Sequence, residues 1–310
     1  MENDTNPATT ADTRPLWKRI VQFPLVAMLL ALAAVLLSLA LPTLAVATTG
    51  LADALTQDQA IILNGVVAPL IVFAVYKLVV PRLGKWRRDD LPPGGAVKDF
   101  ALGSVGAGVL MSVIVGITAL LGGYTVAGWG GSTSFLFLFF VAGVQAGFIE
   151  EVVMRGIIFR FVEEFGGSWM ALVVSALVFG FGHAWNDNAT LLSSIAIAVE
   201  AGVLLGAAYL LTRSLWLAIG IHFGWNVVQG YIWDVAVSGN AVDGMLDARV
   251  AGPELISGGA FGLEASVVAM VLATGAGLWL LWLAARRGHI VRPMWRRGGA
   301  PGVPGYAIAA

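Results

Sequence analysis

The 310-residue chain contains no cysteine, and only 12% of its residues are charged. The absence of cysteine excludes disulfide bonds and thiolate metal sites. An ordinary soluble domain carries about twice this charged fraction, so the composition does not fit a soluble protein. The formal net charge of −1 is not the basic excess typical of nucleic-acid-binding proteins, and no nucleic-acid partner is expected.

Apolar residues take the place of the missing charge. They make up 58% of the chain, and the mean hydropathy is +0.84. Runs of about 18 or more residues with few charges are typical of membrane-spanning helices. The pattern predicts an all-α, polytopic membrane helix bundle with about eight transmembrane helices and no soluble domain. The predicted spans are 20–47, 58–80, 99–121, 133–164, 168–186, 190–212, 214–233 and 262–285.

Basic residues predict the orientation of this bundle. If the N-terminus is cytoplasmic and the chain crosses eight times, all Lys and Arg except Arg155 and Arg249 fall in cytoplasmic segments. This is the positive-inside pattern, so we expect an integral protein of a bacterial plasma membrane with both termini in the cytoplasm. We expect residues 1–16 to be a disordered cytoplasmic tail, 17–290 the membrane domain, and 291–310 a flexible cytoplasmic tail.

The stretch AGFIEEVVMRGIIFR, residues 146–160, places two adjacent glutamates inside an apolar run. A charged side chain near the bilayer centre costs at least about 2.5–3.5 kcal/mol on insertion scales. Arg155 follows Glu151 by four residues, so the two share a helix face and can form an ion pair. Glu150 points about 100° away and is not covered by that pair. This stretch alone is explained equally well by a structural ion pair and by a functional site.

Two further stretches favour a site. FGFGHAWN places Phe179 and His183 four residues apart on the fifth predicted span, and IGIHFGWN places His222 and Asn226 four apart on the seventh. At about 1.5 Å rise per residue, these residues and Glu151 share one buried layer of the bundle. A lone intramembrane histidine is more often a hydrogen-bonding partner between helices, but two histidines, an asparagine and a diglutamate at one depth are typical of a reaction chamber.

The three stretches fit the motifs E-E-x-x-x-R, F-x-x-x-H and H-x-x-x-N, in this order on successive helices. In this they resemble the CPBP family of intramembrane proteases. The family includes the type II CAAX prenyl endopeptidases and bacterial bacteriocin-processing and immunity-associated homologues. The resemblance covers a catalytic core of about residues 133–233 and leaves the first three spans and the last outside it.

The resemblance implies an intramembrane endopeptidase that hydrolyses a peptide bond of a membrane-associated protein or peptide. Glu150 is then the base that activates water, because Glu151 already has an arginine partner, and burial in a dry site is expected to help it accept a proton. His183 and His222 position the water or stabilise the tetrahedral intermediate. Asn226 offers a neutral N–H donor to the oxyanion.

The remaining motif residues have supporting roles. Arg155 is expected to hold Glu151 ionised and in place, and Phe179 to act in packing. Whether a metal takes part stays open at this point. One glutamate, taken as Glu150, with His183 and His222 is an established kind of zinc set, while a metal-free, glutamate-activated water fits the same residues and is slightly favoured.

Two non-enzymatic functions are alternatives. A membrane scaffold or immunity-type partner protein would retain the polar layer only for helix packing. A proton-coupled transporter would also place Glu and His inside the membrane. The chain has no visible internal repeat and no pair of corresponding broken helices, which disfavours the transporter. The intact set of motifs favours the protease.

Overall fold

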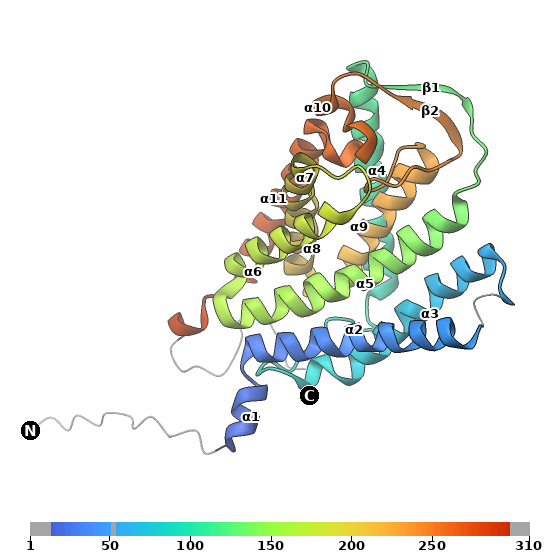
Figure 1. The fold of residues 1–310 in the computed structure, drawn as a ribbon. Helices are drawn as coiled ribbons and strands as arrows, with labels where there is room; N and C mark the ends of the chain where they lie inside the picture. Colours follow the sequence, from blue (N-terminus) through green and yellow to red (C-terminus); the bar gives the residue numbers. More distant parts are fainter. Residues whose placement is uncertain (1–13, 51–53, 298–310) are drawn as a thin grey trace, which may run out of the picture.

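The computed structural model describes residues 14–50 and 54–297. Within this part of the chain the fold is a helix bundle with one small antiparallel sheet (Figure 1). The predicted class, a polytopic bundle that is nearly all-α, is therefore confirmed. The α-helices are α1 Leu16–Val21, α2 Pro24–Thr49, α3 Gln57–Leu78, α4 Ala96–Leu120, α5 Gly147–Glu151, α6 Arg160–Gly182, α7 Leu191–Val199, α8 Ala201–Thr212, α9 Trp216–Val227, α10 Glu254–Ser257 and α11 Val267–Arg286.

Shorter elements complete the chain. Three are wide, π-helical segments that continue an α-helix, and five are single 3₁₀ turns. The π-helical segments are η3 Phe137–Ala146, η4 Val152–Phe159 and η6 Val228–Ile232. The 3₁₀ turns are η2 Val80–Arg82, η5 His183–Trp185, η7 Gly259–Phe261, η8 Leu263–Ala265 and η9 Met294–Arg296.

Six helical segments of the described residues are long and apolar enough to cross a membrane. The longest, Phe137–Trp185, is interrupted at Gly167, whose φ of 81° and ψ of 172° are not helical. α9 and η6 together are shorter than the other candidates. The count of about eight spans and the N-in, C-in orientation therefore stay predictions. The six segments are Pro24–Thr49, Gln57–Arg82, Ala96–Leu120, Phe137–Trp185, Leu191–Thr212 and Val267–Arg286.

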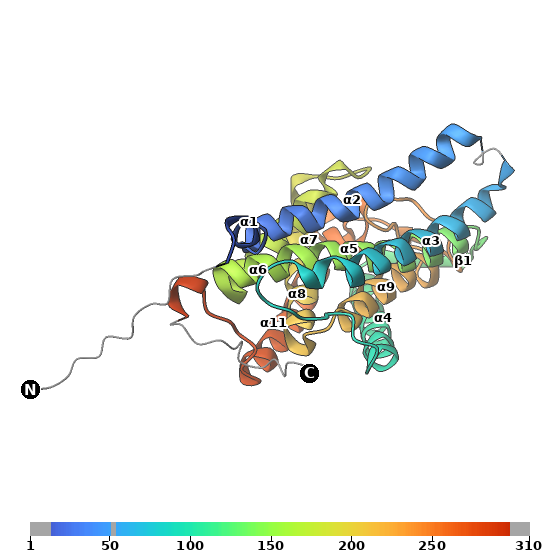
Figure 2. The same ribbon diagram turned by 90° about the horizontal axis from the view of Figure 1, so that it is seen from below.

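Two segments that lie between predicted spans pair as a sheet. β1 (Tyr124–Trp129) and β2 (Leu246–Val250) are antiparallel, with Tyr124 opposite Val250. The sheet lies at the end of the bundle away from α1 (Figures 1 and 2), and Figure 2 shows α2 and α3 side by side along one flank. Non-adjacent loops are thereby joined at this end.

Glycines bring α4 and α9 into close contact. A Cβ on Gly220 would lie 2.2 Å from the carbonyl oxygen of Phe100, and one on Gly224 would lie 2.3 Å from that of Ser104. On α4, a Cβ on Gly103 would likewise lie 2.4 Å from the carbonyl oxygen of Leu217 on α9. Small residues that allow such approach are common at membrane helix interfaces. The glycine face of α9 is thus fixed against α4.

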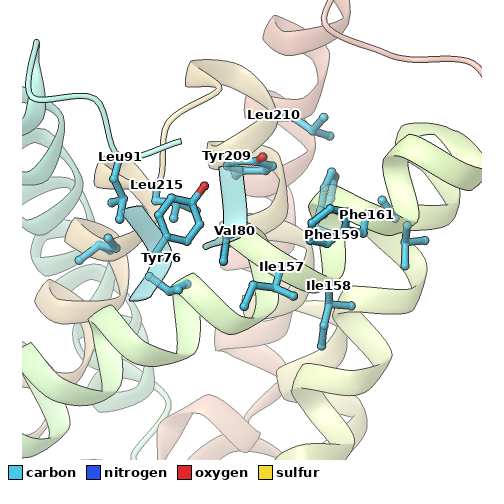
Figure 3. Packing of buried hydrophobic residues seen from close by; sticks show 14 of the residues in the cluster. Tyr76, Val80, Leu91, Ile157, Ile158, Phe159, Phe161, Tyr209, Leu210 and Leu215 are labelled. Carbon is cyan, nitrogen blue, oxygen red and sulfur yellow. The ribbon is translucent and has the colours of Figure 1, made fainter. Parts of the chain in front are cut away.

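A buried aromatic cluster joins α3, η4 and α8 (Figure 3). Phe159 packs edge-on against Tyr209, with ring centroids 5.3 Å apart. Ile157 and Val80 are fully buried beside them. This packing ties the segment that carries the diglutamate to the first helices of the chain.

Charges of the α3–α4 loop turn inward beside this cluster. Asp90 is fully buried, and it forms ion pairs with Arg160 (Nη1 to Oδ2, 2.8 Å) and Arg88 (Nε to Oδ1, 3.1 Å). The Tyr76 hydroxyl donates to Asp90 at 2.9 Å, and Arg88 also pairs with Glu163 at 3.2 Å. Arg160, which was expected at a membrane-surface turn, is fully buried in this network.

The start of the predicted C-terminal tail joins the same network. The Val291 amide donates to Ser168 Oγ at 2.8 Å, and Ser168 Oγ donates to Glu163 at 2.6 Å. Arg297 donates to the backbone oxygens of Glu163 and Glu164 at 3.0 and 2.7 Å. Residues 291–297 thus pack against α6, whereas residues 1–13 and 298–310 of the predicted tails lie outside the described residues.

The α4–α9 contact generates the first prediction. Gly220→Ala is expected to destabilise the protein by about 1–3 kcal/mol, because the new methyl group overlaps the Phe100 carbonyl. Gly106→Ala, on α4, meets no atom within 4 Å and should be neutral or slightly stabilising. Thermal unfolding of the detergent-solubilised variants measures both. Equal midpoints for the two variants would contradict the packing described here.

The loop network generates a second prediction. Asp90→Asn should cost about 3–5 kcal/mol, because it leaves two buried arginines short of a partner. Asp89→Asn is the matched control, since Asp89 pairs with Lys77 at a partly exposed position, where an ion pair is worth about 0–1 kcal/mol. Thermal unfolding at neutral pH separates the two, and a similar loss in both variants would refute the buried network.

The same network makes stability depend on pH. Burial alone would raise the pKa of Asp90, but Arg88 and Arg160 outweigh burial and hold its pKa below the ordinary 3.8. A carboxylate with a lowered pKa stabilises the fold above its unfolded-state pKa, and this contribution is lost as the pH falls through the folded-state value. Unfolding midpoints measured from pH 6 downward should therefore fall less steeply in Asp90→Asn than in the unsubstituted protein.

Candidate active site

The diglutamate lies on one α-helical turn between two π-helical segments. α5 carries Glu150 and Glu151, with η3 before it and η4 after it. π-helical turns inside α-helices are frequent at functional sites because they redirect neighbouring side chains. Glu151 is fully buried, whereas the side chain of Glu150 is 36% exposed. The described residues therefore enclose Glu150 only partly, whereas they bury Glu151.

Glu151 joins two motifs from different helices. Its Oε1 accepts from Arg155 Nη1 at 2.8 Å, as predicted, and also lies 3.0 Å from His222 Nδ1. A carboxylate can only accept, so Nδ1 of His222 carries the hydrogen and its Nε2 is left for another partner. Arg155 is fully buried and also donates to the backbone oxygens of Ala201 and Gly202, at 3.3 and 3.4 Å. The ion pair thus connects α5, α8 and α9.

Glu150 and His183 face each other across a short gap. Glu150 Oε2 lies 3.9 Å from His183 Nε2. The other ring nitrogen, His183 Nδ1, donates to the Phe179 carbonyl oxygen at 2.7 Å, which leaves Nε2 as an acceptor. A water molecule at about 2.8 Å from each group can donate to both at this separation.

Phe179 separates the two histidines. Its ring centroid is 4.8 Å from that of His183 and 5.9 Å from that of His222, edge-on in both cases. The Arg155 guanidinium lies over the same ring at 4.6 Å. Phe179 therefore packs against three motif residues and contributes no reactive group, in agreement with its predicted role.

Asn226 has one amide hydrogen engaged and one left. Its Nδ2 donates to the Ala142 carbonyl oxygen at 2.9 Å, which fixes the side chain against η3. His222 and Asn226 follow Gly220 and Gly224 by two residues each, about 200° around α9. The glycine face contacts α4, so the polar face is directed to the opposite side, toward Glu151.

Four of the motif residues, Phe179, His183, His222 and Asn226, line a cavity whose space, counted together with its part open to solvent, is about 430 Å³. His183 and His222 lie at its wall together with Asn226. Two glutamates that the sequence analysis missed, Glu200 and Glu264, line the same cavity. The signal was available, because Glu200 lies inside the predicted span 190–212 and Glu264 near the start of the predicted span 262–285, and a carboxylate inside an apolar run is the observation that singled out Glu150.

The expected zinc set of Glu150, His183 and His222 is not assembled as a metal-binding group. Within residues 14–50 and 54–297, no three His, Asp or Glu side chains converge as one. Nδ1 of His222 is engaged by Glu151 and Nδ1 of His183 by a backbone carbonyl oxygen, so Nε2 is the nitrogen of each ring that is left for another partner.

Comparison with known families agrees with the motifs. Residues 132–228 match the sequence model of the family described as Type II CAAX prenyl endopeptidase Rce1-like. No curated protein and no solved structure gives a significant match. The matched segment begins before η3 and ends at the start of η6, so it contains all three motifs. Residues 132–228 are thus similar to Rce1-like type II CAAX prenyl endopeptidases, which supports the CPBP family predicted from the motifs over this segment.

Proposed function

We propose that the protein is an intramembrane endopeptidase that hydrolyses a peptide bond of a membrane-associated protein or peptide. The observation that carries this is the approach of Glu150 and His183, from separate motifs, to 3.9 Å beside a cavity that His222 and Asn226 also line. The similarity of residues 132–228 to Rce1-like endopeptidases supports the same reaction class.

Hydrolysis begins with a water held between Glu150 and His183. One hydrogen of the water points to Glu150 Oε2 and the other to His183 Nε2, which turns a lone pair toward the substrate. Glu150 removes its proton as the water oxygen bonds to the carbonyl carbon. The exposure of Glu150 gives the water and the peptide access to the base.

The developing oxyanion needs donors that are already in place. Asn226 supplies its remaining amide hydrogen, since the other is held by Ala142. His222 donates from Nε2 when both ring nitrogens are protonated, a form that the adjacent Glu151 carboxylate favours. When the tetrahedral intermediate collapses, the C–N bond breaks and Glu150 returns its proton to the leaving nitrogen.

The chemistry proposed here is of the glutamic type and uses no metal. Each proposed step uses a side chain of the protein, and no group of three His, Asp or Glu side chains that could hold a metal is found within residues 14–50 and 54–297. Stoichiometric zinc in the purified protein, together with loss of activity on chelation and recovery on adding zinc, would overturn the metal-free proposal and favour a metalloendopeptidase.

The surroundings of the reaction follow from the fold. We propose an integral protein of a bacterial plasma membrane, with both termini cytoplasmic, that meets its substrate in the lipid bilayer. A prenylated CAAX substrate is part of this proposal only if the host prenylates proteins. No nucleic-acid partner is proposed.

Glu150→Gln tests the reaction directly. The amide cannot accept the proton, so we expect cleavage to fall by at least about 100-fold, with little change in stability at this partly exposed position. Membrane peptidomes of cells that express either protein at equal levels provide the measurement, and the lost cleavage products identify the substrate. Identical peptidomes and an unchanged phenotype would favour the non-catalytic scaffold instead.

The Glu151–Arg155 pair makes a separate prediction. Arg155→Met should destabilise the fold by about 3–5 kcal/mol, because it leaves the Glu151 carboxylate buried without its cation. Adding Glu151→Gln should restore much of the unfolding midpoint, since both charges are then gone. Activity should stay low in the double variant, because the partner that orients His222 has changed. Recovery of both stability and activity would show that the pair is purely structural.

A further inference from the structure

The cavity extends beyond the motif residues to two glutamates. Glu200 lies between α7 and α8, and Glu264 lies in η8, before α11. They are only 1% and 3% exposed, yet both line the cavity that contains His183 and Asn226. Neither belongs to the three motifs, and the proposed hydrolysis does not use them.

Glu264 is held in place by neighbouring donors. It accepts hydrogen bonds from the backbone amide of Ser238 and from the side-chain amide of Gln229. Both donors are neutral amides, so neither balances the charge of an ionised Glu264. A positive charge beside it would favour the ionised form.

Glu200 has no such support. Its Oε2 is buried and has no hydrogen-bond partner among the described residues. None of the ion pairs within this part of the chain includes Glu200 or Glu264. No Lys or Arg is among the residues that line the cavity, and Arg155, which binds the backbone of Ala201 and Gly202 next to Glu200, is committed to Glu151. A buried carboxylate is costly unless it is paired, and neither Glu200 nor Glu264 has a cationic partner among the described residues, so this end of the cavity lacks a positive charge.

We propose that Glu200 and Glu264 form an acidic subsite that binds a Lys or Arg side chain of the peptide substrate. The inference rests on the proposed endopeptidase function and specifies its substrate class. Carboxylate oxygens that only accept require N–H donors, which both basic side chains supply. Ile197, Leu204 and Leu205 line the same cavity and suit the apolar stem of such a side chain.

Binding can be measured separately from cleavage by using the Glu150→Gln protein in nanodiscs as a trap. The trap is incubated with a peptide library in which one position at a time is Lys, Arg or the uncharged norleucine, and retained peptides are quantified by mass spectrometry. Peptides with Lys or Arg at one fixed position should be enriched at least about tenfold over norleucine, the lower end of the range for close charge pairs.

Adding Glu200→Gln and Glu264→Gln to the trap should abolish this enrichment, and adding Glu254→Gln should not. Glu254 is an exposed carboxylate of α10 and serves as the matched control. If the triple variant does not fold, Glu200→Gln alone in the trap should reduce the enrichment. Absence of any preference for basic peptides in the trap, or a preference that survives both substitutions, would overturn the subsite.

The unsubstituted protein is tested for hydrolysis of the same library. A trap that prefers basic peptides, with no hydrolysis by the unsubstituted protein, would refute the endopeptidase proposal and leave the acidic subsite supported. Hydrolysis without a preference for basic peptides would support the endopeptidase and refute the subsite.

Discussion

The site depends on one physical constraint, namely that a charge placed inside an apolar bundle must be paired. Arg155 and Glu151 satisfy each other at 2.8 Å, and the same carboxylate oxygen holds His222. One ion pair therefore sets the position of three elements and the tautomer of a histidine. Because Glu151 is committed in this way, its neighbour Glu150 remains without a strong partner, and two adjacent residues of the same type take different roles.

The positions of His222 and Asn226 depend on contacts between helix backbones as much as on charge. α9 has a glycine face that meets α4 and a polar face that meets Glu151, so a displacement of α4 would move His222 and Asn226 together. α4 lies outside the segment that matches the family. The helices that precede the matched segment thus act as the rigid support against which the motif residues are held.

Much of the site could be predicted because ionisable residues inside apolar runs are rare. Glu150, Glu151, His183 and His222 stood out for this reason, and helical spacing alone predicted the Glu151–Arg155 pair. The π-helical segments and the β1–β2 sheet could not be predicted, because they depend on contacts between distant segments. The exposure of Glu150 likewise depends on how neighbouring helices pack. Glu200 was missed because it lies inside the predicted span 190–212, which was assigned from its apolar residues alone.

The buried charges of the α3–α4 loop bear on how much of the chain the family-matched segment needs in order to fold. Arg160 and Glu163 belong to the family-matched segment, but their partners Asp90 and Arg88 come from the α3–α4 loop. Residues 291–297 satisfy further groups of the same helix. A fragment cut at the borders of sequence similarity would keep every motif, and Glu163 would keep Arg213, but Arg160 would be buried without the carboxylate that neutralises it. The segment that the family model matches, residues 132–228, is therefore smaller than the part of the chain that must fold together.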